Sequence, residues 1–179
     1  SLNYNVYSGL SLQPRATCDE QNGSATPNVY IPMSHKQLRA SKEFAVRFSE
    51  VDAMNIVWHG SYPLYFEDAR EAFGAQYGLE YMTMARAGYY APLVELTFRY
   101  LRPIRYEQQC RIDIIYTATA AAKIIFDYEI HDALTDELLA TGHSVQAFMD
   151  KDYQLQWYKP TFYAEWQERW NLNSEENHD

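Results

Sequence analysis

Hydrophobic residues recur at every second position in several stretches of the chain, which is the pattern of strands with one buried face. Between residues 109 and 119, for example, Cys110, Ile112, Ile114 and Tyr116 follow this period. The same period predicts strands at residues 42–48, 91–101, 109–119, 123–131 and 138–149, with a short one at 154–157. Gly142 interrupts the last long strand and predicts a bend or β-bulge there.

Another period marks residues 61–78, where apolar side chains recur every three or four positions, as on one face of a helix. This face consists of Tyr62, Tyr65, Phe66, Ala69, Phe73 and Tyr77. The opposite, polar face consists of Glu67, Asp68, Arg70, Glu71 and Gln76. The Ser61 hydroxyl is expected to cap the first turn, and Gly78 to end the helix. A shorter helix is predicted at 79–87, and a helix or turn-rich cap at 160–170.

The order of these elements is a strand, two helices and then at least four strands. This order predicts an α+β fold in which one antiparallel sheet wraps around the long helix. A chain of 179 residues fits one domain with an arm. We expect an irregular N-terminal extension at 1–41, the domain at 42–170, and a polar, acidic tail at 171–179.

The composition excludes several classes of function. A net charge of −9 argues against nucleic-acid binding and weakly against an anionic membrane surface. No apolar run reaches transmembrane length, so no membrane insertion is expected. The two cysteines lie far apart, without a Cys/His cluster, so no structural metal is expected. A cytoplasmic location is the expectation that follows.

The strongest candidate for chemistry is Asp52, in an apolar loop several residues before the long helix. The first N–H groups of a helix have no partner inside it, and with the helix dipole they attract negative charge. A carboxylate beside such donors has the parts needed for acyl transfer, because one group attacks or activates water while the other holds the oxyanion. The structural alternative is a loop aspartate that only caps its own turn.

The run FSEVDAMNIVWHGSYPLYFEDAR, residues 48–70, resembles the signature of the 4-hydroxybenzoyl-CoA thioesterase family of hotdog-fold enzymes, which includes the Tol–Pal-associated acyl-CoA thioesterases. The matching residues are Glu50, Asp52, Ile56, Val57, Trp58, His59, Tyr62, Phe66, Glu67, Ala69 and Arg70. The family usually has glycine where this chain has Asn55, and asparagine is the other residue best able to adopt φ > 0. The runs at 94–114 and 138–150 resemble later strands of the family, so the resemblance covers about residues 42–165.

The resemblance implies a hotdog fold and hydrolysis of acyl-CoA. It implies that Asp52 is the nucleophile, giving a mixed anhydride, or the general base on water; the sequence leaves both open. It also implies that the backbone amide of His59 polarises the thioester carbonyl. The Gly60 amide is a second expected donor.

Other residues are expected to support this site. Glu50 and Asn55 match or occupy motif positions in the loop, and Tyr62 matches the motif but is expected mainly in the core. Glu67 and Glu71 are reserve catalytic carboxylates, because some related hotdog enzymes use a helix carboxylate. Glu67 can instead pair with the arginine three residues later. The basic residues nearest the sheet are candidates for CoA phosphates: Arg99, Arg102, Arg105 and Lys123.

The resemblance also implies a homodimer, with tetramers as an option, in which the active site lies between protomers. No metal or redox cofactor is implied, and CoA enters only as part of the substrate. Two rivals remain: a thioesterase for acyl carrier protein, and a non-catalytic hotdog protein that binds acyl-CoA. A hotdog hydratase needs an acid–histidine pair in a different motif, which this sequence does not show.

Overall fold

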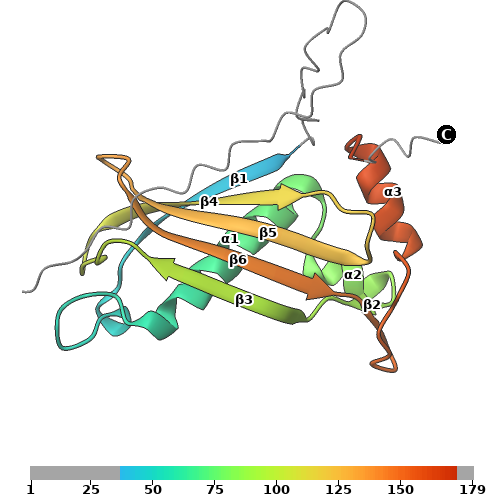
Figure 1. Cartoon of the computed structure of the whole chain (residues 1–179), viewed down its shortest axis with the longest axis horizontal. Coiled ribbons are helices and arrows are strands. Elements are labelled where there is room, and N and C mark those ends of the chain that lie inside the picture. Colours follow the sequence, from blue (N-terminus) through green and yellow to red (C-terminus); the bar gives the residue numbers. More distant parts are fainter. Residues whose placement is uncertain (1–36, 173–179) are drawn as a thin grey trace, which may run out of the picture. The chain divides into compact units, whose positions relative to one another are not determined.

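The computed structural model describes residues 37–172, in which a five-stranded antiparallel sheet packs around one long helix (Figure 1). The strand order is β1-β4-β5-β6-β3, so β1 and β3 form the two edges. The strands are β1 (Leu38–Ala45), β3 (Leu93–Tyr100), β4 (Gln109–Thr117), β5 (Lys123–Asp132) and β6 (Leu138–Ala147). The predicted α+β class and wrapped sheet are confirmed.

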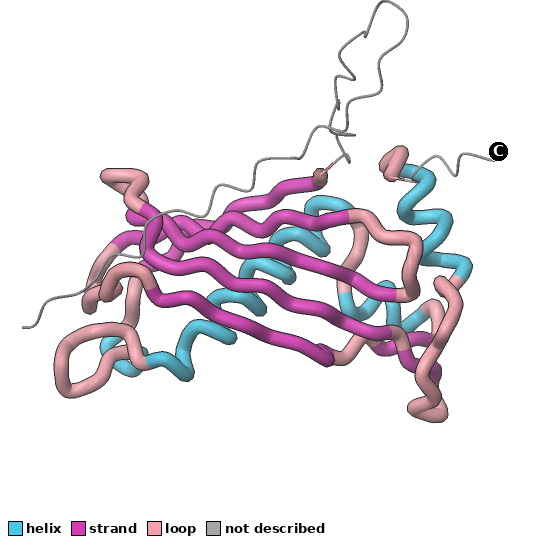
Figure 2. The backbone as a smooth tube through the Cα atoms, viewed as in Figure 1, coloured by secondary structure: helices cyan, strands magenta, loops and turns pink. Residues whose placement is uncertain are grey.

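The other described elements are helices and short strands. The long helix α1 (Tyr62–Tyr77) runs across one face of the sheet, as the cyan coil behind the strands in Figure 2 shows. The other helices are α2 (Tyr81–Arg86), α3 (Thr161–Arg169) and the 3-10 turns η1 (Phe48–Glu50) and η2 (His59–Ser61). A two-stranded sheet pairs β2 (Tyr89–Tyr90) with β7 (Met149–Asp150). Among residues 37–172, no helix is long and apolar enough to cross a membrane.

The predicted buried faces of the two central strands are confirmed. On β4 the fully buried side chains are Cys110, Ile112, Ile114 and Tyr116, and on β5 they are Ile124, Phe126, Tyr128 and Ile130. These side chains and the apolar face of α1 form the core. Central strands follow the two-residue period closely because one of their faces packs on the helix along the whole strand length.

The predicted apolar face of α1 is also confirmed, with two corrections at its polar positions. Gly78 ends the helix in the left-handed conformation, at φ 76°. Ser61, however, has helical backbone angles, and its hydroxyl donates to the Glu50 carbonyl at 3.5 Å rather than capping the helix. Arg70 was predicted on the polar face but is buried, because the Tyr81 ring of α2 lies over its guanidinium group at 5.7 Å.

The edges of the sheet depart from the sequence prediction. Strand β1 begins at Leu38 rather than residue 42, and Phe48 is 76% exposed in η1 instead of buried in a strand. The predicted strand at 154–157 is reduced to a single bridge between Leu155 and Met149. Strand β2 was not predicted. At these positions the surrounding loops, rather than the local sequence pattern, determine the secondary structure.

Gly142 does not form the predicted bend or bulge. It pairs in register with Phe98 and Tyr128, and the irregularities lie elsewhere in the sheet. The reason for glycine is packing: a Cβ atom at this position would overlap the ring of Phe66. That ring stacks on Tyr128 with centroids 4.2 Å apart. The Phe66 ring of α1 therefore fills the space on β6 that a side chain at residue 142 would occupy.

The predicted helix at 160–170 is confirmed as α3, which covers the C-terminal end of α1. The indole of Trp166 donates to the Tyr77 carbonyl at 2.8 Å, and the Tyr116 and Tyr163 hydroxyls share a hydrogen bond of 2.7 Å. Of the predicted arm at 1–41 and tail at 171–179, residues 1–36 and 173–179 lie outside the described residues. Residues 38–41 belong to the domain rather than to an arm.

Candidate active site

Asp52 begins a tight turn of the backbone. Its carbonyl accepts from the Asn55 N–H at 2.9 Å, and its own N–H donates to the Ile56 carbonyl at 2.9 Å. Asn55 has φ 60°, in the left-handed region that this turn requires. The expectation that asparagine can replace glycine here is therefore confirmed.

The turn is fixed to a distant part of the chain. The Val57 N–H donates to the Ile104 carbonyl at 2.8 Å, and Ile56 forms a bridge with Arg105. On the other side, the Trp58 N–H donates to the Glu50 carbonyl at 2.8 Å. The Asp52 turn is thus held between the segment that follows β3 and the segment that leads into α1.

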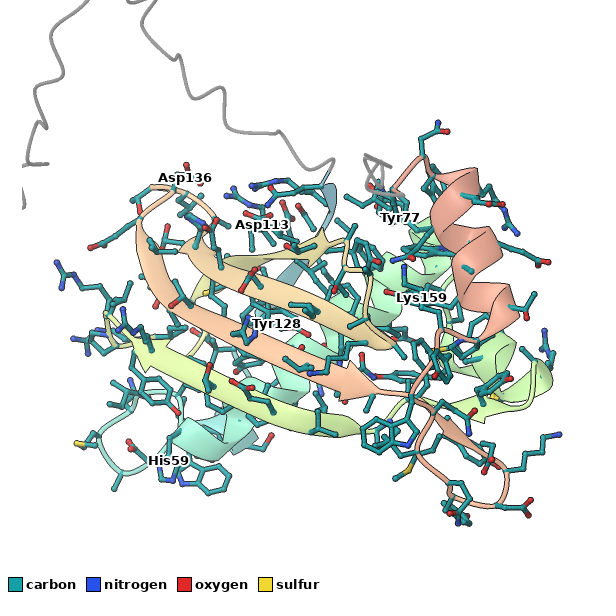
Figure 3. The ribbon with its side chains drawn as sticks, turned by 45° about the vertical axis from the view of Figure 1, so that its right-hand side comes forward. His59, Tyr77, Asp113, Tyr128, Asp136 and Lys159 are labelled. Atoms are coloured by element: carbon teal, nitrogen blue, oxygen red, sulfur yellow. The ribbon has the colours of Figure 1, made fainter. Side chains whose placement is uncertain are left out.

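A pocket of about 350 Å³ lies where β3 ends and α1 begins, near the His59 label in Figure 3. Its lining is Asp52, Met54, Ile56, Val57, His59, Tyr62, Tyr100, Leu101, Arg102 and Pro103. The structure therefore brings together Asp52, His59 and Tyr62 with Arg102, one of the predicted candidates for CoA phosphates. It also adds Tyr100 at the end of β3, which was not predicted at the site.

The Asp52 carboxylate is half-buried and makes one hydrogen bond within residues 37–172. Its Oδ1 atom accepts from the Met54 N–H at 2.8 Å, which is the turn-capping role of a loop aspartate. Its Oδ2 atom has no such partner among the described residues. The carboxylate is thus oriented by the turn through one oxygen, and the other oxygen is available for chemistry.

The backbone amides of His59 and Gly60 lie at the N-terminal end of the helical segment. They start η2, which continues directly into α1, so neither amide has an acceptor within the helix. The Ser61 N–H, by contrast, already donates to the Trp58 carbonyl at 2.9 Å. A Cβ atom at Gly60 would overlap the Trp58 ring, so the present position of this ring depends on glycine. Among the described residues outside the helix, these two N–H groups have no backbone acceptor either.

Glu50 supports the loop from outside the pocket. Its carboxylate accepts from the Arg47 N–H at 2.9 Å and from the Tyr65 hydroxyl at 2.8 Å. Burial, together with this hydrogen bond to Glu50, raises the pKa of Tyr65. Because Tyr65 stays protonated, the bond ties the loop to the buried face of α1.

Tyr62 lines the pocket with a neutral hydroxyl. Burial, reinforced by the nearby Tyr100 and Cys110, raises the pKa of Tyr62 to about 12. Its ring also packs edge-on against Tyr100, with centroids 4.8 Å apart. Tyr62 therefore combines the core role expected from its position with one wall of the pocket.

The reserve carboxylates do not line the Asp52 pocket of the same chain. Glu67 forms an ion pair with Arg70 and accepts from the Tyr81 hydroxyl at 3.4 Å. Glu71 lines a different cavity. Among the basic residues considered for CoA phosphates, Arg102 lines the Asp52 pocket, where its Nε atom is 3.0 Å from Glu137.

One cluster of potential metal ligands lies on the other face of the sheet. The ligand atoms of Asp113, Glu129 and His131 lie within 4.8 Å of one another, on the neighbouring strands β4 and β5. Sequence spacing did not show it, because strand register brings these side chains together. The Arg111 guanidinium already donates to Asp113 at 3.1 Å and offsets its charge. The absence of a metal cofactor stays a prediction.

An antiparallel sheet wrapped around one long helix defines a hotdog-fold protein. The model of the thioesterase-like superfamily matches residues 46–167, and the chain belongs to this superfamily. The resemblance found in the sequence, the hotdog fold and the thioester hydrolase class are thereby confirmed.

The sequence identity between this chain and individual relatives is low. The chain is 27% identical over 113 residues to YneP of Bacillus subtilis, a candidate acyl-CoA thioesterase; the match covers 63% of this chain and 81% of YneP. It is also 27% identical to the chloroplast acyl-acyl carrier protein thioesterase ATL3 of Arabidopsis thaliana, over 63% of this chain and 59% of the relative. Among solved structures, the DHNA-CoA thioesterase of Staphylococcus aureus superposes with a TM-score of 0.67 at 23% identity, covering 79% and 97% of the two chains.

Proposed function

We propose that this protein hydrolyses acyl-CoA thioesters and that Asp52 is its catalytic carboxylate. The observation that carries the proposal is the pocket that joins Asp52 to the start of the helix at His59. The carboxylate and the free amides there have the complementary roles that acyl transfer needs. Membership of the thioesterase-like superfamily supports the same reaction.

The reaction has two possible routes through Asp52. As a nucleophile, the carboxylate attacks the thioester carbon, CoA leaves as a thiolate that takes a proton from solvent, and water hydrolyses the mixed anhydride. As a general base, it takes a proton from the water that attacks the same carbon, and CoA then leaves as a thiolate that takes up this proton. In both routes the carbonyl oxygen becomes an oxyanion, to which the amides of His59 and Gly60 donate.

The proposal includes a homodimer formed through β3. This edge strand exposes apolar side chains, with Val94 59% and Tyr100 52% exposed, which is unfavourable for an edge in water. A two-fold antiparallel pairing of two β3 strands would cover these side chains and extend the sheet across both protomers. A tetramer built from two such dimers remains a further option.

This pairing would make the active site composite. The Asp52 pocket lies at the C-terminal end of β3, beside Tyr100. Two more cavities lie near the N-terminal end of the strand, a mixed one beside α2 and an apolar one around Pro92. Antiparallel pairing places the C-terminal end of one strand against the N-terminal end of the other. The acyl group of a thioester held at Asp52 would then extend into the partner protomer.

The test is thiol release from short, long and aromatic acyl-CoAs by the wild type and by Asp52→Asn. We expect Asp52→Asn to lower kcat/KM at least about a hundredfold, because the variant has no carboxylate to attack or to accept a proton. Asp68→Asn is the matched control, since Asp68 lines none of these cavities and pairs with Lys42 of β1, the edge strand opposite β3, and it should keep full activity. Equal rates for wild type and Asp52→Asn, with both folded, would rule out Asp52 and redirect attention to Glu67 and Glu71.

A second candidate substrate is an acyl carrier protein thioester, which the similarity to the Arabidopsis relative favours. The chemistry at Asp52 would be the same, and only the group beyond the sulfur would differ. Comparing one acyl group on CoA and on acyl carrier protein decides between the two. Saturable binding of both without turnover would instead favour a non-catalytic hotdog protein. The cytoplasmic location stays a prediction, which cell fractionation tests.

A further inference from the structure

A second cavity, also of about 350 Å³, lies between α1, α2 and the sheet and shares no lining residue with the Asp52 pocket. Its wall is mixed: hydrophobic side chains from α2 and the sheet lie beside charged residues, and two polar side chains of the wall are buried. The residues that matter here are Leu79, Met84, Ile124, Phe126, Arg70 and Gln146. Such a wall fits an organic group that is mainly hydrocarbon but carries a polar atom.

Arg70 is the unusual member of this wall. Its side chain is only 5% exposed, and one terminal nitrogen forms an ion pair with Glu67. Its Nε and Nη1 atoms are buried and have no hydrogen-bond partner among the described residues. Buried polar groups of proteins nearly always have a partner, because an unpaired one keeps the cost of losing water. The two N–H groups therefore lack an acceptor that a ligand could bring.

The surrounding charges indicate what kind of acceptor fits. Glu67 already neutralises the Arg70 guanidinium, and the cavity rim carries Glu71, Glu80 and Arg86. These five groups sum to one net negative charge, so another carboxylate would be repelled. A neutral oxygen, such as a hydroxyl or a carbonyl, can accept the hydrogen bonds without adding charge.

We propose that this cavity binds the far end of the acyl group and that Arg70 selects acyl groups that carry a hydroxyl or carbonyl oxygen there. The inference rests on the proposed acyl-CoA thioesterase function, and on the proposed dimer that places this cavity opposite the Asp52 pocket of the partner protomer. It makes Arg70 a specificity-determining residue, because it touches the acyl group away from the thioester carbon. The Tyr81 ring lies over the guanidinium and lines the cavity on the side of α2.

The test compares unsubstituted acyl-CoAs with ω-hydroxyacyl-CoAs of equal chain length, across a series of lengths. At the length that fits the cavity, we expect the wild type to prefer the hydroxylated substrate at least about tenfold in kcat/KM, because a site built around a hydrogen bond rejects the analogue that lacks it. Arg70→Met keeps the length of the side chain but has no N–H group, and should bring the ratio to about one. Lys42→Met is the control: it removes a cation paired with Asp68 of α1 at 3.8 Å and should keep the wild-type ratio.

The outcomes separate this inference from the function on which it rests. Hydrolysis of both substrates by the wild type with a ratio near one at every length overturns the role of Arg70 but leaves the thioesterase intact. No hydrolysis of any acyl-CoA overturns the proposed function itself. A preference for ω-carboxyacyl-CoA over ω-hydroxyacyl-CoA overturns the choice of a neutral acceptor.

A binding measurement covers the case in which Arg70→Met does not fold. Calorimetry on the Asp52→Asn protein, which retains Arg70, compares the same pair of substrates without turnover. We expect the hydroxylated one to bind at least about tenfold more tightly. Equal affinities at every chain length would contradict the inference.

Discussion

Asn55 occupies the position of the Asp52 turn that needs a left-handed backbone, with φ 60°. This position departs from the usual residue of the family, and the structure shows how asparagine meets the requirement. A β-branched side chain at such a φ clashes with the neighbouring backbone. The orientation of the Asp52 carboxylate therefore depends on the identity of residue 55.

We predict that Asn55→Gly keeps activity within about twofold, whereas Asn55→Val lowers stability by about 1–2 kcal/mol and reduces kcat/KM. The reason is that valine cannot hold the turn that orients Asp52. Urea denaturation and thiol release on both variants check this. If Asn55→Val were as active and as stable as the wild type, the turn would not be what positions the carboxylate.

The candidate site was partly predictable at the level of residues. Asp52, the His59 amide and Tyr62 follow each other closely in sequence, so their motif alone is enough to place them together. Tyr100 and Arg102 reach the same pocket only because Ile104 bonds to Val57, which is a contact between segments far apart in the chain. Sequence spacing carries no signal for such a contact. The buried position of Arg70 was missed for the same reason, since it depends on α2.

At the scale of elements, the packing of α1 on β6 depends on the fit between the large Phe66 side chain and the glycine at position 142. The Phe66 ring occupies the space where a Cβ atom of residue 142 would lie. The strand keeps its pairing on both sides at this point, so neither element can simply bend away. Overpacking at such a point costs free energy because it forces shifted side chains or backbone.

We predict that Gly142→Ala lowers the free energy of unfolding by about 1–3 kcal/mol, and that adding Phe66→Leu recovers part of the loss. The smaller leucine makes room for the new methyl group. Urea denaturation of the two single variants and the double variant gives the coupling between the positions. Strict additivity of the two losses would show that the methyl group and the ring do not compete for space.

The element boundaries were predictable where burial is continuous. The central strands β4 and β5 and the helix α1 repeat their periods over their whole lengths, because each has one face in the core. On the edge strands β1 and β3, burial does not follow the period over the whole strand. On β3, Val94 and Tyr100 continue the alternation but remain 59% and 52% exposed, although Tyr100 packs against Tyr62. Sequence pattern reports that a face is apolar, but not which surface covers it.

At the scale of the whole molecule, the exposed edge strand β3 is the basis of a prediction about assembly. We expect Val94→Lys to shift the protein from the proposed dimer to a monomer and to lower thioesterase activity at least about tenfold, because charge on an edge strand opposes strand pairing. Light scattering after size exclusion measures the first effect. Leu134→Lys is the control, since Leu134 is 89% exposed in a turn outside the sheet and should change neither property. A fully active monomer would contradict the composite site.

The buried tyrosines predict how the protein responds to alkali. Burial raises the pKa of Tyr62 from 10.0 to about 12, and burial also raises the pKa of Cys110 from 9.0 to about 12. Between these values the folded protein holds protons that the unfolded chain releases. The stabilisation is therefore fully present below about pH 9 and is lost as pH rises toward 12.

We predict a melting temperature that falls steadily above about pH 9–10, with tyrosinate absorbance from the buried rings rising only as the protein unfolds. Thermal melts followed by tyrosinate absorbance across this range measure both. Tyr62→Phe should reduce the steepness of the fall, and Tyr158→Phe, at a tyrosine that is 88% exposed, should not. A melting temperature independent of pH throughout this range would refute the prediction.

The contact between Phe66 and Gly142 also has a consequence for the history of the sequence. Two positions that share one volume cannot drift independently, because a larger residue at either position is tolerated only after the other has become smaller. Homologues should therefore show correlated substitution at these two sites, with glycine kept wherever the helix carries an aromatic ring. Lineages that replace the ring with a small side chain are where a side chain on the strand should first become acceptable.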